Sequence, residues 1–432
     1  MRIAYFSPLP NQRTGIANYS NHLVSELSRF AQVELFHDGA QFFPGLKVNN
    51  YLAQPSSLGR LHEFDAVVFN FGNNPEFHLA MWHVFQMNPG VVILHDAVLY
   101  YLMAGRGKGG IIRENLGKKP TTIDRLRRTL EIVEKTDRPG WLMGHSQPHK
   151  FPCLESIISK AKGIIVHSHI ASELVRKAGF AGSVEIIPMP VYNKELEAVS
   201  DCIAKRAETR RRLGLKKNDI LIGCFGFQNR VKRNAVLIKA AELLNKKSKF
   251  KILFAGIGEL PVEEINNSPI ASDVLCPGYL SDKEFREHLA ASDIVVNLRY
   301  PSMGETSATL LLAMLHSKPC IVTDDSWFSE LPDDCVLKIS HGKRELSELS
   351  RGIEQLFAMP SKRRKLGQNA RNYVLKFHHP EKVGPNFLKV LERGRGNQNY
   401  HGESNFLDSH KNSAVSNYFS KRTKELIAFR DP

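Results

Sequence analysis

The chain has 432 residues, of which 42% are hydrophobic and 24% charged, and its formal net charge is +15. These proportions are typical of a folded enzyme and exclude a disordered chain, and the length predicts two or three domains. Six scattered cysteines without a CxxC pair argue against a zinc ribbon or a disulfide framework and favour a reducing compartment. Since no apolar stretch suits a signal peptide or a membrane span, we expect a cytoplasmic protein.

Apolar runs of strand length alternate with helical patterns along the whole chain. Residues 2–7 predict a first strand, and residues 16–27 then place apolar side chains at helical spacing. Further strands are predicted at residues 33–36, 66–69, 91–94 and 163–167. The pattern restarts with a strand at 219–226 and a helix at 235–244, followed by strands at 250–255, 273–276, 294–298 and 319–323. This alternation predicts an α/β fold with two doubly wound domains built on parallel sheets.

The restart also predicts the domain boundaries. We expect an N-terminal domain over residues 1–195 and a C-terminal domain over 196–379, joined by the polar, proline-containing stretch 188–205. Residues 380–393 predict a closing helix. Residues 394–416 are rich in Asn, Ser, Gly and His, and we expect residues 394–432 to form a mobile extension, with a short helix as an alternative at 418–429.

The basic residues are concentrated in four stretches, at 106–128, 204–217, 229–251 and 361–376, and the rest of the chain is net acidic. Local basicity indicates anionic partners at particular places. The first stretch contains the start of a basic amphipathic helix near residue 121, which predicts either docking on an anionic membrane surface or packing on its own domain. The second and fourth stretches are interpreted as solvated helix faces. Because the basic runs lack interleaved aromatic residues and a recognition motif, nucleic-acid binding is a weaker alternative.

A glycine-containing loop follows the first strand of each predicted domain, at the sheet edge where doubly wound folds bind ligands. The first loop contains Gly15 and Ile16, and the second contains Gly226, Arg230 and Lys232. Glycine lets the backbone approach a ligand and the next helix N-terminus attracts phosphate, so we expect Lys232 to pair with a diphosphate. Neither loop matches the GxGxxG or P-loop pattern, and a simple turn is the alternative.

A second polar cluster lies between the strand predicted at 294–298 and a helix predicted at 310–315. It contains Arg299, Glu305, Thr306 and Ser307. A carboxylate accepts two hydroxyl hydrogen bonds at once, which suits a polyhydroxylated ligand. The alternative is that Glu305 and Thr306 cap the helix.

Seven segments, in order from residue 1 to about 392, together resemble the retaining nucleotide-sugar glycosyltransferases of family 4, also called glycosyl transferase group 1. The resemblance implies the GT-B fold, in which two Rossmann-like domains with parallel sheets face each other across a cleft. The segments are TGIANY at 14–19, HD at 95–96, VHS at 166–168, Lys232, AGIG at 255–258, PGYLSD at 277–282, and GETS with its followers at 304–319.

The resemblance also implies roles for individual residues. Lys232 would hold the donor diphosphate, while Glu305 and, from the N-terminal domain, His95 would contact the donor sugar; these three are the catalytic candidates. The implied donor-binding residues are Gly15, Ile16, Gly226, Arg230, Gly258, Tyr279, Leu280, Arg299, Thr306 and Ser307.

Two positions depart from the family pattern. Phe227 stands where many members have an arginine after the loop glycine, and Arg230 or Arg299 is the candidate substitute. The family signature is two glutamates separated by seven residues; with Glu305 first, the second position is Ala313. The other alignment places the two positions at 304 and 312, which are Gly and Leu. A non-catalytic sugar-binding relative is therefore an alternative.

The implied activity is transfer of a hexosyl group from a nucleotide-diphosphate sugar to an acceptor with retention of anomeric configuration. Cations at the leaving diphosphate lower the barrier, and the sequence has no DxD motif, so we expect neither a metal nor another cofactor. The acceptor would be a glycan, a lipid-linked or a small molecule, with the inner membrane face as an alternative location. A nucleotide-sugar epimerase or phosphorylase of similar build is the enzymatic alternative.

Overall fold

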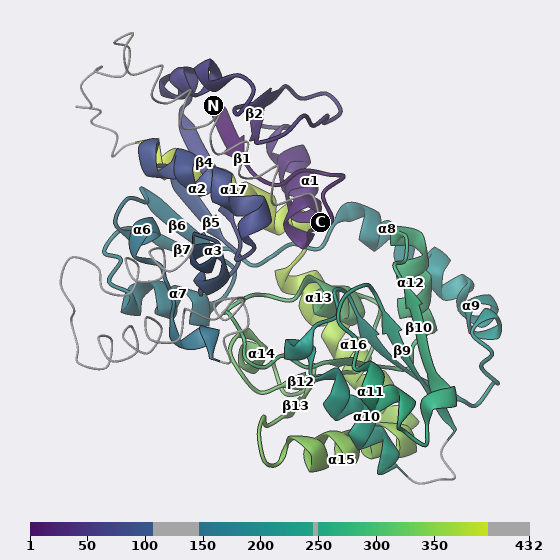
Figure 1. Ribbon diagram of the computed structural model, residues 1–432. Helices are drawn as coiled ribbons and strands as arrows, with labels where there is room; N and C mark the ends of the chain where they lie inside the picture. Colours follow the sequence, from purple (N-terminus) through teal and green to yellow (C-terminus); the bar gives the residue numbers. More distant parts are fainter. Residues whose placement is uncertain (107–146, 245–248, 396–432) are drawn as a thin grey trace, which may run out of the picture. The chain divides into compact units, whose positions relative to one another are not determined.

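A computed structural model describes residues 1–106, 147–244 and 249–395, and the chain forms two compact α/β units (Figure 1). Unit 1 comprises Met1–His167, Ala171–Ile187 and the chain from Gly384 onward, and unit 2 comprises Ser168–Ile170 and Pro188–Val383. The helix predicted near residue 121 and nearly all of the extension predicted at 394–432 lie outside the described residues.

Unit 1 is built on a seven-stranded sheet with the strand order β3-β2-β1-β4-β5-β6-β7, in which all paired strands are parallel. The strands are β1 (Arg2–Phe6), β2 (Gln32–His37), β3 (Val48–Asn50), β4 (Ala66–Phe71), β5 (Val91–Leu94), β6 (Gly163–Val166) and β7 (Val184–Ile186). The central strands are buried along almost their whole length because helices cover both sheet faces.

The helices of this part of the chain are α1 (Gly15–Leu27), α2 (Pro75–Met87), α3 (Tyr100–Ala104), α6 (Glu155–Ile158), α7 (His169–Lys177) and α17 (Pro380–Arg395). Short 3₁₀ segments lie at Pro55–Glu63 and Pro148–Lys150. Helix α17 brings the C-terminal part of the chain onto unit 1, where a Cβ on Gly384 would lie 3.7 Å from the Cβ of Glu26 in α1.

Unit 2 is built on a six-stranded parallel sheet with the order β10-β9-β8-β11-β12-β13. The strands are β8 (Ile220–Phe225), β9 (Phe250–Ala255), β10 (Val274–Gly278), β11 (Ile294–Asn297), β12 (Cys320–Thr323) and β13 (Leu337–Ile339). Its helices are α8 (Asn193–Ala204), α9 (Arg206–Arg212), α10 (Asn234–Glu242), α11 (Val262–Asn266), α12 (Asp282–Ala291), α13 (Ala308–Leu315), α14 (Trp327–Glu330), α15 (Glu345–Ala358) and α16 (Pro360–Phe377), with 3₁₀ segments at Arg230–Lys232 and Ala271–Asp273. Helices α8 and α9 pack on α12, α13 packs on α16, and α10 packs on α11 and α15.

The strand order of each sheet reverses beside its first strand. In unit 1 this point lies between β1 and β4, and in unit 2 it lies between β8 and β11. The two loops that leave such neighbouring strands diverge to opposite sheet faces, which opens a crevice at the carboxyl edge of the sheet. The polar segments singled out in the sequence, at 226–233 and 298–307, follow β8 and β11 and therefore border this point of unit 2.

The long elements predicted from the sequence are confirmed within a few residues. Three strands were not predicted, namely β3, β7 and β13; each has only three residues, which is too short to form a recognisable apolar run. Residues 193–204, within the stretch predicted as the linker, form helix α8. None of the helices in the described ranges has the length and apolar character needed to cross a bilayer.

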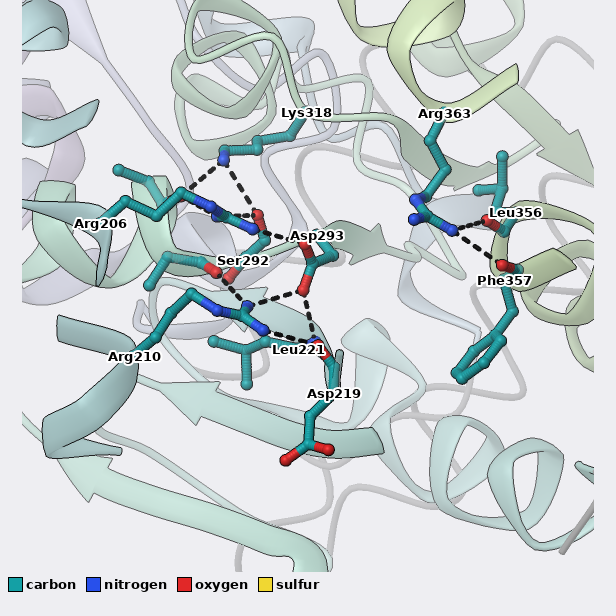
Figure 2. A network of polar contacts seen from close by, with 12 residues as sticks. Arg206, Arg210, Asp219, Leu221, Ser292, Asp293, Lys318, Leu356, Phe357 and Arg363 are labelled. Atoms are coloured by element: carbon teal, nitrogen blue, oxygen red, sulfur yellow. Dashed lines mark hydrogen bonds and ion pairs between the residues drawn. The ribbon is translucent and has the colours of Figure 1, made fainter. Parts of the chain in front are cut away.

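The second basic stretch is only partly a solvated helix face. Arg206 and Arg210 of α9 converge on Asp293, the residue before β11 (Figure 2). The Nη1 atom of Arg210 lies 2.8 Å from Oδ2 of Asp293, and only 11% of the Arg210 side chain is exposed. The same Oδ2 accepts a hydrogen bond from the Leu221 backbone amide at 2.9 Å. The interpretation as a solvated face is therefore wrong for these arginines, because they anchor α9 to the amino edge of the sheet.

The fourth basic stretch, at 361–376, also contains both a basic residue that bonds to the protein and others that are exposed. Arg363 of α16 donates to the carbonyl oxygens of Leu356 at 2.5 Å and Phe357 at 2.8 Å, and so satisfies the end of helix α15. The remaining basic residues of both stretches that are exposed, as predicted, include Arg211, Lys216, Lys217, Arg364 and Lys365.

Candidate functional site

The loop between β8 and α10 contains a buried lysine, Lys232, whose ammonium group lies close to Gly226. Gly226 has a φ of +92°, which a residue with a Cβ adopts only under strain. A Cβ at this position would lie 3.1 Å from Nζ of Lys232 and 2.9 Å from Cγ2 of Thr309. The Lys232 ammonium donates to the carbonyl oxygen of Phe225, and the residue is only 5% exposed. Lys232 is therefore held at the end of β8, facing the first turn of α13.

Burial lowers the pKa of Lys232 to about 8, with nearby Cys224 opposing this shift and Arg299 adding to it. A buried cation without a carboxylate partner is costly, and an anion placed against it restores the charged form. The loop is thus prepared for an anionic ligand.

Glu305 is held at one oxygen and less engaged at the other. Its Oε2 accepts hydrogen bonds from Ser302 Oγ at 2.9 Å and from the Met303 amide at 2.6 Å. Arg299 Nε lies 3.3 Å from Oε1, and 16% of each of these two side chains is exposed. Because a carboxylate oxygen accepts more than one hydrogen bond, Oε1 keeps the capacity to bind a hydroxyl group.

The N-terminus of α13 is capped by Ser307, whose Oγ accepts from the Leu310 amide at 3.3 Å. The alternative that Glu305 and Thr306 cap this helix is therefore wrong. Thr306 is 8% exposed, and its buried hydroxyl has no hydrogen-bond partner among the described residues. An unsatisfied buried hydroxyl beside a helix N-terminus is available to a ligand.

Three exposed apolar side chains follow neighbouring strands at the other end of this edge. Phe227, Ile257 and Tyr279 come after β8, β9 and β10, and they are 63%, 38% and 60% exposed. Leu280 beside them is half-buried. The two aromatic rings among these side chains, Phe227 and Tyr279, suit stacking on a planar ligand.

Gly258 has a packing role as well as its predicted binding role. A Cβ on Gly258 would lie 2.0 Å from the carbonyl oxygen of Gln228, because the loops after β8 and β9 are bonded backbone to backbone. The Gln228 amide donates to the Ile257 carbonyl at 2.8 Å, and the Glu259 amide donates to the Gln228 carbonyl at 2.9 Å. Arg230 in the same loop is 88% exposed along its side chain and pairs with Glu259 at 2.7 Å.

Several residues that support these loops were not predicted. Thr309 accepts from Asn297 Nδ2 at 3.1 Å, and Asn234 Nδ2 donates to Gln228 Oε1 at 2.8 Å. Both asparagines are buried, at 3% and 4% exposure. The sequence indicated a supporting role for these asparagines only through their positions, at the end of a strand and at the start of a helix.

The family position expected to carry a second carboxylate is inside the protein. Ala313 lies on α13 and is fully buried, whereas Leu312 of the other alignment is half-buried. Neither alignment supplies a second carboxylate to the site.

In unit 1, the predicted residues lie at the carboxyl edge of the sheet. Gly15 begins α1 after its cap Thr14, with open space around its Cα, and Ile16 packs on the next loop, where a Cβ on Gly72 would lie 2.3 Å from its Cδ1. His95 follows β5 and its Nε2 lies 2.6 Å from Asn70 Oδ1.

The environment of His95 keeps its ring neutral. Burial lowers the pKa of His95 well below its ordinary value, and the neighbouring His167 and His78 act in the same direction. The ring meets Tyr19 edge-on, at a centroid distance of 4.5 Å and an angle of 86°, and lies 4.9 Å from the ring of His167.

The structure therefore brings Gly226, Lys232, Arg299, Glu305, Thr306 and Ser307 to the switch point of unit 2. Arg230, Gly258, Tyr279 and Leu280 lie farther along the same edge, after β8, β9 and β10. Gly15, Ile16 and His95 belong to unit 1.

Comparisons with known proteins bear on the family and on the fold. Residues 205–373, within unit 2, match the family model for glycosyl transferases group 1. No curated protein sequence matches this chain.

Solved structures share the fold. A structure of Anabaena HepE in complex with UDP has a TM-score of 0.64 at 15% identity, covering 91% of this chain and 100% of that one. The sucrose-phosphate synthase of Thermosynechococcus elongatus has a TM-score of 0.63 at 15% identity, with 91% and 98% covered. WaaG, a glycosyltransferase involved in lipopolysaccharide biosynthesis, has a TM-score of 0.60 at 16% identity, with 88% and 98% covered. The prediction of a GT-B-type α/β fold with two Rossmann-like units is confirmed.

Proposed function

We propose that this protein is a glycosyltransferase that moves a sugar from a nucleotide-diphosphate sugar to an acceptor. The observation that carries the proposal is the buried ammonium of Lys232 under Gly226, facing α13 in the region that matches the group 1 family model. HepE has been solved in complex with UDP and with UDP-glucose, which supports a UDP-sugar as the donor. The resemblance to family 4 supports hexosyl transfer with retention.

The leaving diphosphate would be stabilised by Lys232, Arg299 and the N-terminus of α13. Negative charge accumulates on the diphosphate as the bond from sugar to phosphate breaks, and fixed positive charge there lowers the barrier. Lys232 is already buried in the folded protein, so its ammonium group has lost its hydration before the ligand binds. Its attraction to the diphosphate is therefore not weakened by bound water. We propose that these groups act without a metal ion.

Arg299 is the better substitute for the arginine that Phe227 replaces. Arg299 is largely buried and close enough to Lys232 to lower its pKa. Arg230 is mostly exposed and is paired with Glu259. Both cations of the proposed diphosphate site thus come from loops at the switch point of unit 2.

Hydroxyl groups of the donor sugar would be bound by Oε1 of Glu305 and by the hydroxyl of Thr306. In unit 1, His95 is the proposed sugar contact. The base of the nucleotide would lie on the apolar side chains that follow β8, β9 and β10. The sugar contacts are supported by atoms that can accept or donate further hydrogen bonds: among the described residues, Oε1 of Glu305 lies near Arg299 only, and the Thr306 hydroxyl has no partner.

The lack of a carboxylate at residue 313, which is Ala, favours a second candidate, a protein that binds a nucleotide sugar without turning it over. In this case the ligand would bind through Lys232 but no sugar would be transferred. The two candidates are separated by measuring binding and turnover on the same preparation.

The decisive experiment compares Lys232→Ala with Lys239→Ala, a variant of an exposed lysine on the following helix. We expect Lys232→Ala to lose at least about 10²-fold in sugar transfer, while its melting temperature is unchanged or raised because a buried cation has been removed. Lys239→Ala should behave as the wild type. Near-normal transfer by Lys232→Ala would overturn the assignment.

A thermal-shift screen with UDP, GDP and their sugar conjugates identifies the donor. A ligand at 100 times its Kd adds about 2.7 kcal/mol of stability, which gives a clear shift. Stabilisation by a nucleotide sugar without release of free nucleotide in the presence of candidate acceptors would select the second candidate.

The acceptor and the location are proposals from the sequence. We propose a cytoplasmic enzyme that can dock on an anionic membrane surface. Flotation with anionic liposomes at low and high salt tests this, and absence of binding at low salt would contradict it.

A further inference from the structure

A group of buried polar side chains lies beneath the carboxyl edge of the sheet in unit 1. Ser7 follows β1, Ser20 lies on α1, Asn70 lies on β4 and His95 follows β5. Their exposed fractions are 4%, 0%, 0% and 7%. Such a group is retained in a core only if its hydrogen bonds are satisfied, and those bonds fix the orientation of each member.

The donor and the acceptor of the Asn70 hydrogen bonds can be assigned. Asn70 Nδ2 donates to Ser20 Oγ at 2.7 Å and to Ser7 Oγ at 3.1 Å, so both of its hydrogens are used. Its Oδ1 therefore faces His95 Nε2, at 2.6 Å. An amide oxygen can only accept, which places a hydrogen on Nε2 of the imidazole.

The other ring nitrogen of His95 is left as an acceptor. The ring is neutral, because burial and the neighbouring histidines lower its pKa, and a neutral imidazole with a hydrogen on Nε2 has a lone pair on Nδ1. Within the described parts of the chain, Nδ1 makes no hydrogen bond. Tyr19 and His167 pack against the ring and fix its plane.

We propose that Asn70 is a positioning residue that holds His95 in the neutral Nε2–H tautomer, so that Nδ1 accepts a hydrogen bond from a hydroxyl group of the donor sugar. The sugar part of this proposal rests on the glycosyltransferase function proposed above. The tautomer part stands on the geometry of unit 1 alone. Asn70 itself touches no ligand, and its effect passes through His95.

The tautomer is tested by nitrogen NMR on protein labelled with ¹⁵N-histidine, with the His95 signals assigned by their loss in His95→Gln. We expect Nε2 to give the signal of a protonated ring nitrogen and Nδ1 that of an unprotonated one. In Asn70→Leu, which cannot accept a hydrogen bond, the preference for Nε2–H should be lost. A hydrogen on Nδ1 in the wild-type protein would overturn the inference.

A second experiment compares the affinity for UDP with the affinity for the UDP-sugar that the thermal-shift screen selects. Asn70→Leu should bind the UDP-sugar several-fold more weakly, as expected for one hydrogen bond, and should bind UDP with unchanged affinity. Asn49→Leu is the matched control, since Asn49 is also a buried asparagine of this sheet and donates to Glu34 Oε2 and to the Leu35 carbonyl. It should lower stability without changing the His95 signals or the preference for the sugar.

Asn70→Asp keeps the test decisive if Asn70→Leu does not fold. A carboxylate in this place still accepts from Nε2, but its charge favours protonation of Nδ1 as well, which removes the acceptor. The NMR signals should then show both nitrogens protonated, and binding of the sugar should weaken. If the wild type shows the Nε2–H tautomer but no nucleotide sugar binds, the proposed function fails and the positioning role of Asn70 remains. If the variants keep the wild-type tautomer and the wild-type affinity for the sugar, the positioning role of Asn70 is overturned.

Discussion

Basic side chains gather at both edges of the sheet in unit 2, but the partners of these side chains differ between the edges. At the amino edge, Arg206, Arg210 and Lys318 donate to main-chain carbonyl oxygens, and the two arginines also pair with Asp293 (Figure 2). At the carboxyl edge, Lys232 has one carbonyl partner and no carboxylate partner among the residues that the structure describes. A basic residue count therefore does not separate a structural cluster from a binding site, whereas the partners of each cation do.

The two edges also differ in how many of their hydrogen-bonding groups have partners. The carbonyl oxygens of Ala290 and Ser292, which end α12, each accept from both Arg206 and Lys318 at the amino edge. At the carboxyl edge the Thr306 hydroxyl has no partner within the described residues, and Glu305 has spare capacity on one oxygen. We expect substitutions at the amino edge to change stability and substitutions at the carboxyl edge to change ligand binding.

The largest effect is expected at Asp293. Asp293→Asn removes the negative charge between Arg206 and Arg210 and should lower the free energy of unfolding by about 3–5 kcal/mol, as in other proteins that lose one partner of a buried ion pair. Urea-induced unfolding measures this change. The matched control is Asp282→Asn, whose side chain is 62% exposed and pairs with Lys194; it should cost less than about 1 kcal/mol. Equal effects in the two variants would remove the distinction between the edges.

The partners of Asp293 show how far the sequence could predict this molecule. The long buried strands were predictable because apolar runs are local, and the closeness of Gly226 and Lys232 was predictable because both lie in one loop. Asp293, in contrast, is 83 residues from Arg210 along the chain, so the arginine run could only be interpreted as a solvated face. The Asn297–Thr309 and Asn234–Gln228 bonds were missed for the same kind of reason, since they depend on which side chains the fold turns toward each other.

A second prediction uses the pH dependence of the amino edge. Burial lowers the pKa of Lys318 from 10.5 to about 7, with Arg206 acting in the same direction. Between these values the unfolded chain binds the proton more tightly, so the free energy of unfolding should rise with pH, by up to about 1.4 kcal/mol per pH unit. Lys318→Met removes this contribution. The difference between wild type and variant, measured from pH 7 to pH 10, should therefore grow in favour of the wild type, and a constant difference would contradict a buried, neutral Lys318.

At the carboxyl edge, the expected effect is on binding. Arg299→Met should weaken UDP binding by about 10- to 100-fold, the effect of losing one charged hydrogen-bond donor, with little loss of stability. Glu305 keeps Ser302 and Met303 as partners, so no buried charge is left alone. Titration calorimetry with UDP measures the affinity. Arg230→Met is the control, and a larger loss there than in Arg299→Met would assign the second diphosphate cation to Arg230.

The smallest effect should separate, by its sign, a hydroxyl that serves the fold from one that is available to a ligand, both at the carboxyl edge. Thr306→Val removes a buried hydroxyl that has no partner among the described residues, so stability should rise slightly, by up to about 1 kcal/mol, while binding of the UDP-sugar weakens several-fold. Thr323→Val is the matched control, because Thr323 Oγ1 accepts from the Arg299 amide at 3.0 Å and its loss leaves a buried N–H group unsatisfied. The same substitution should therefore destabilise the protein at residue 323 and stabilise it at residue 306. Loss of stability in both variants would show that the Thr306 hydroxyl serves the fold, and the carboxyl edge would then keep only Glu305 and its cations for a ligand.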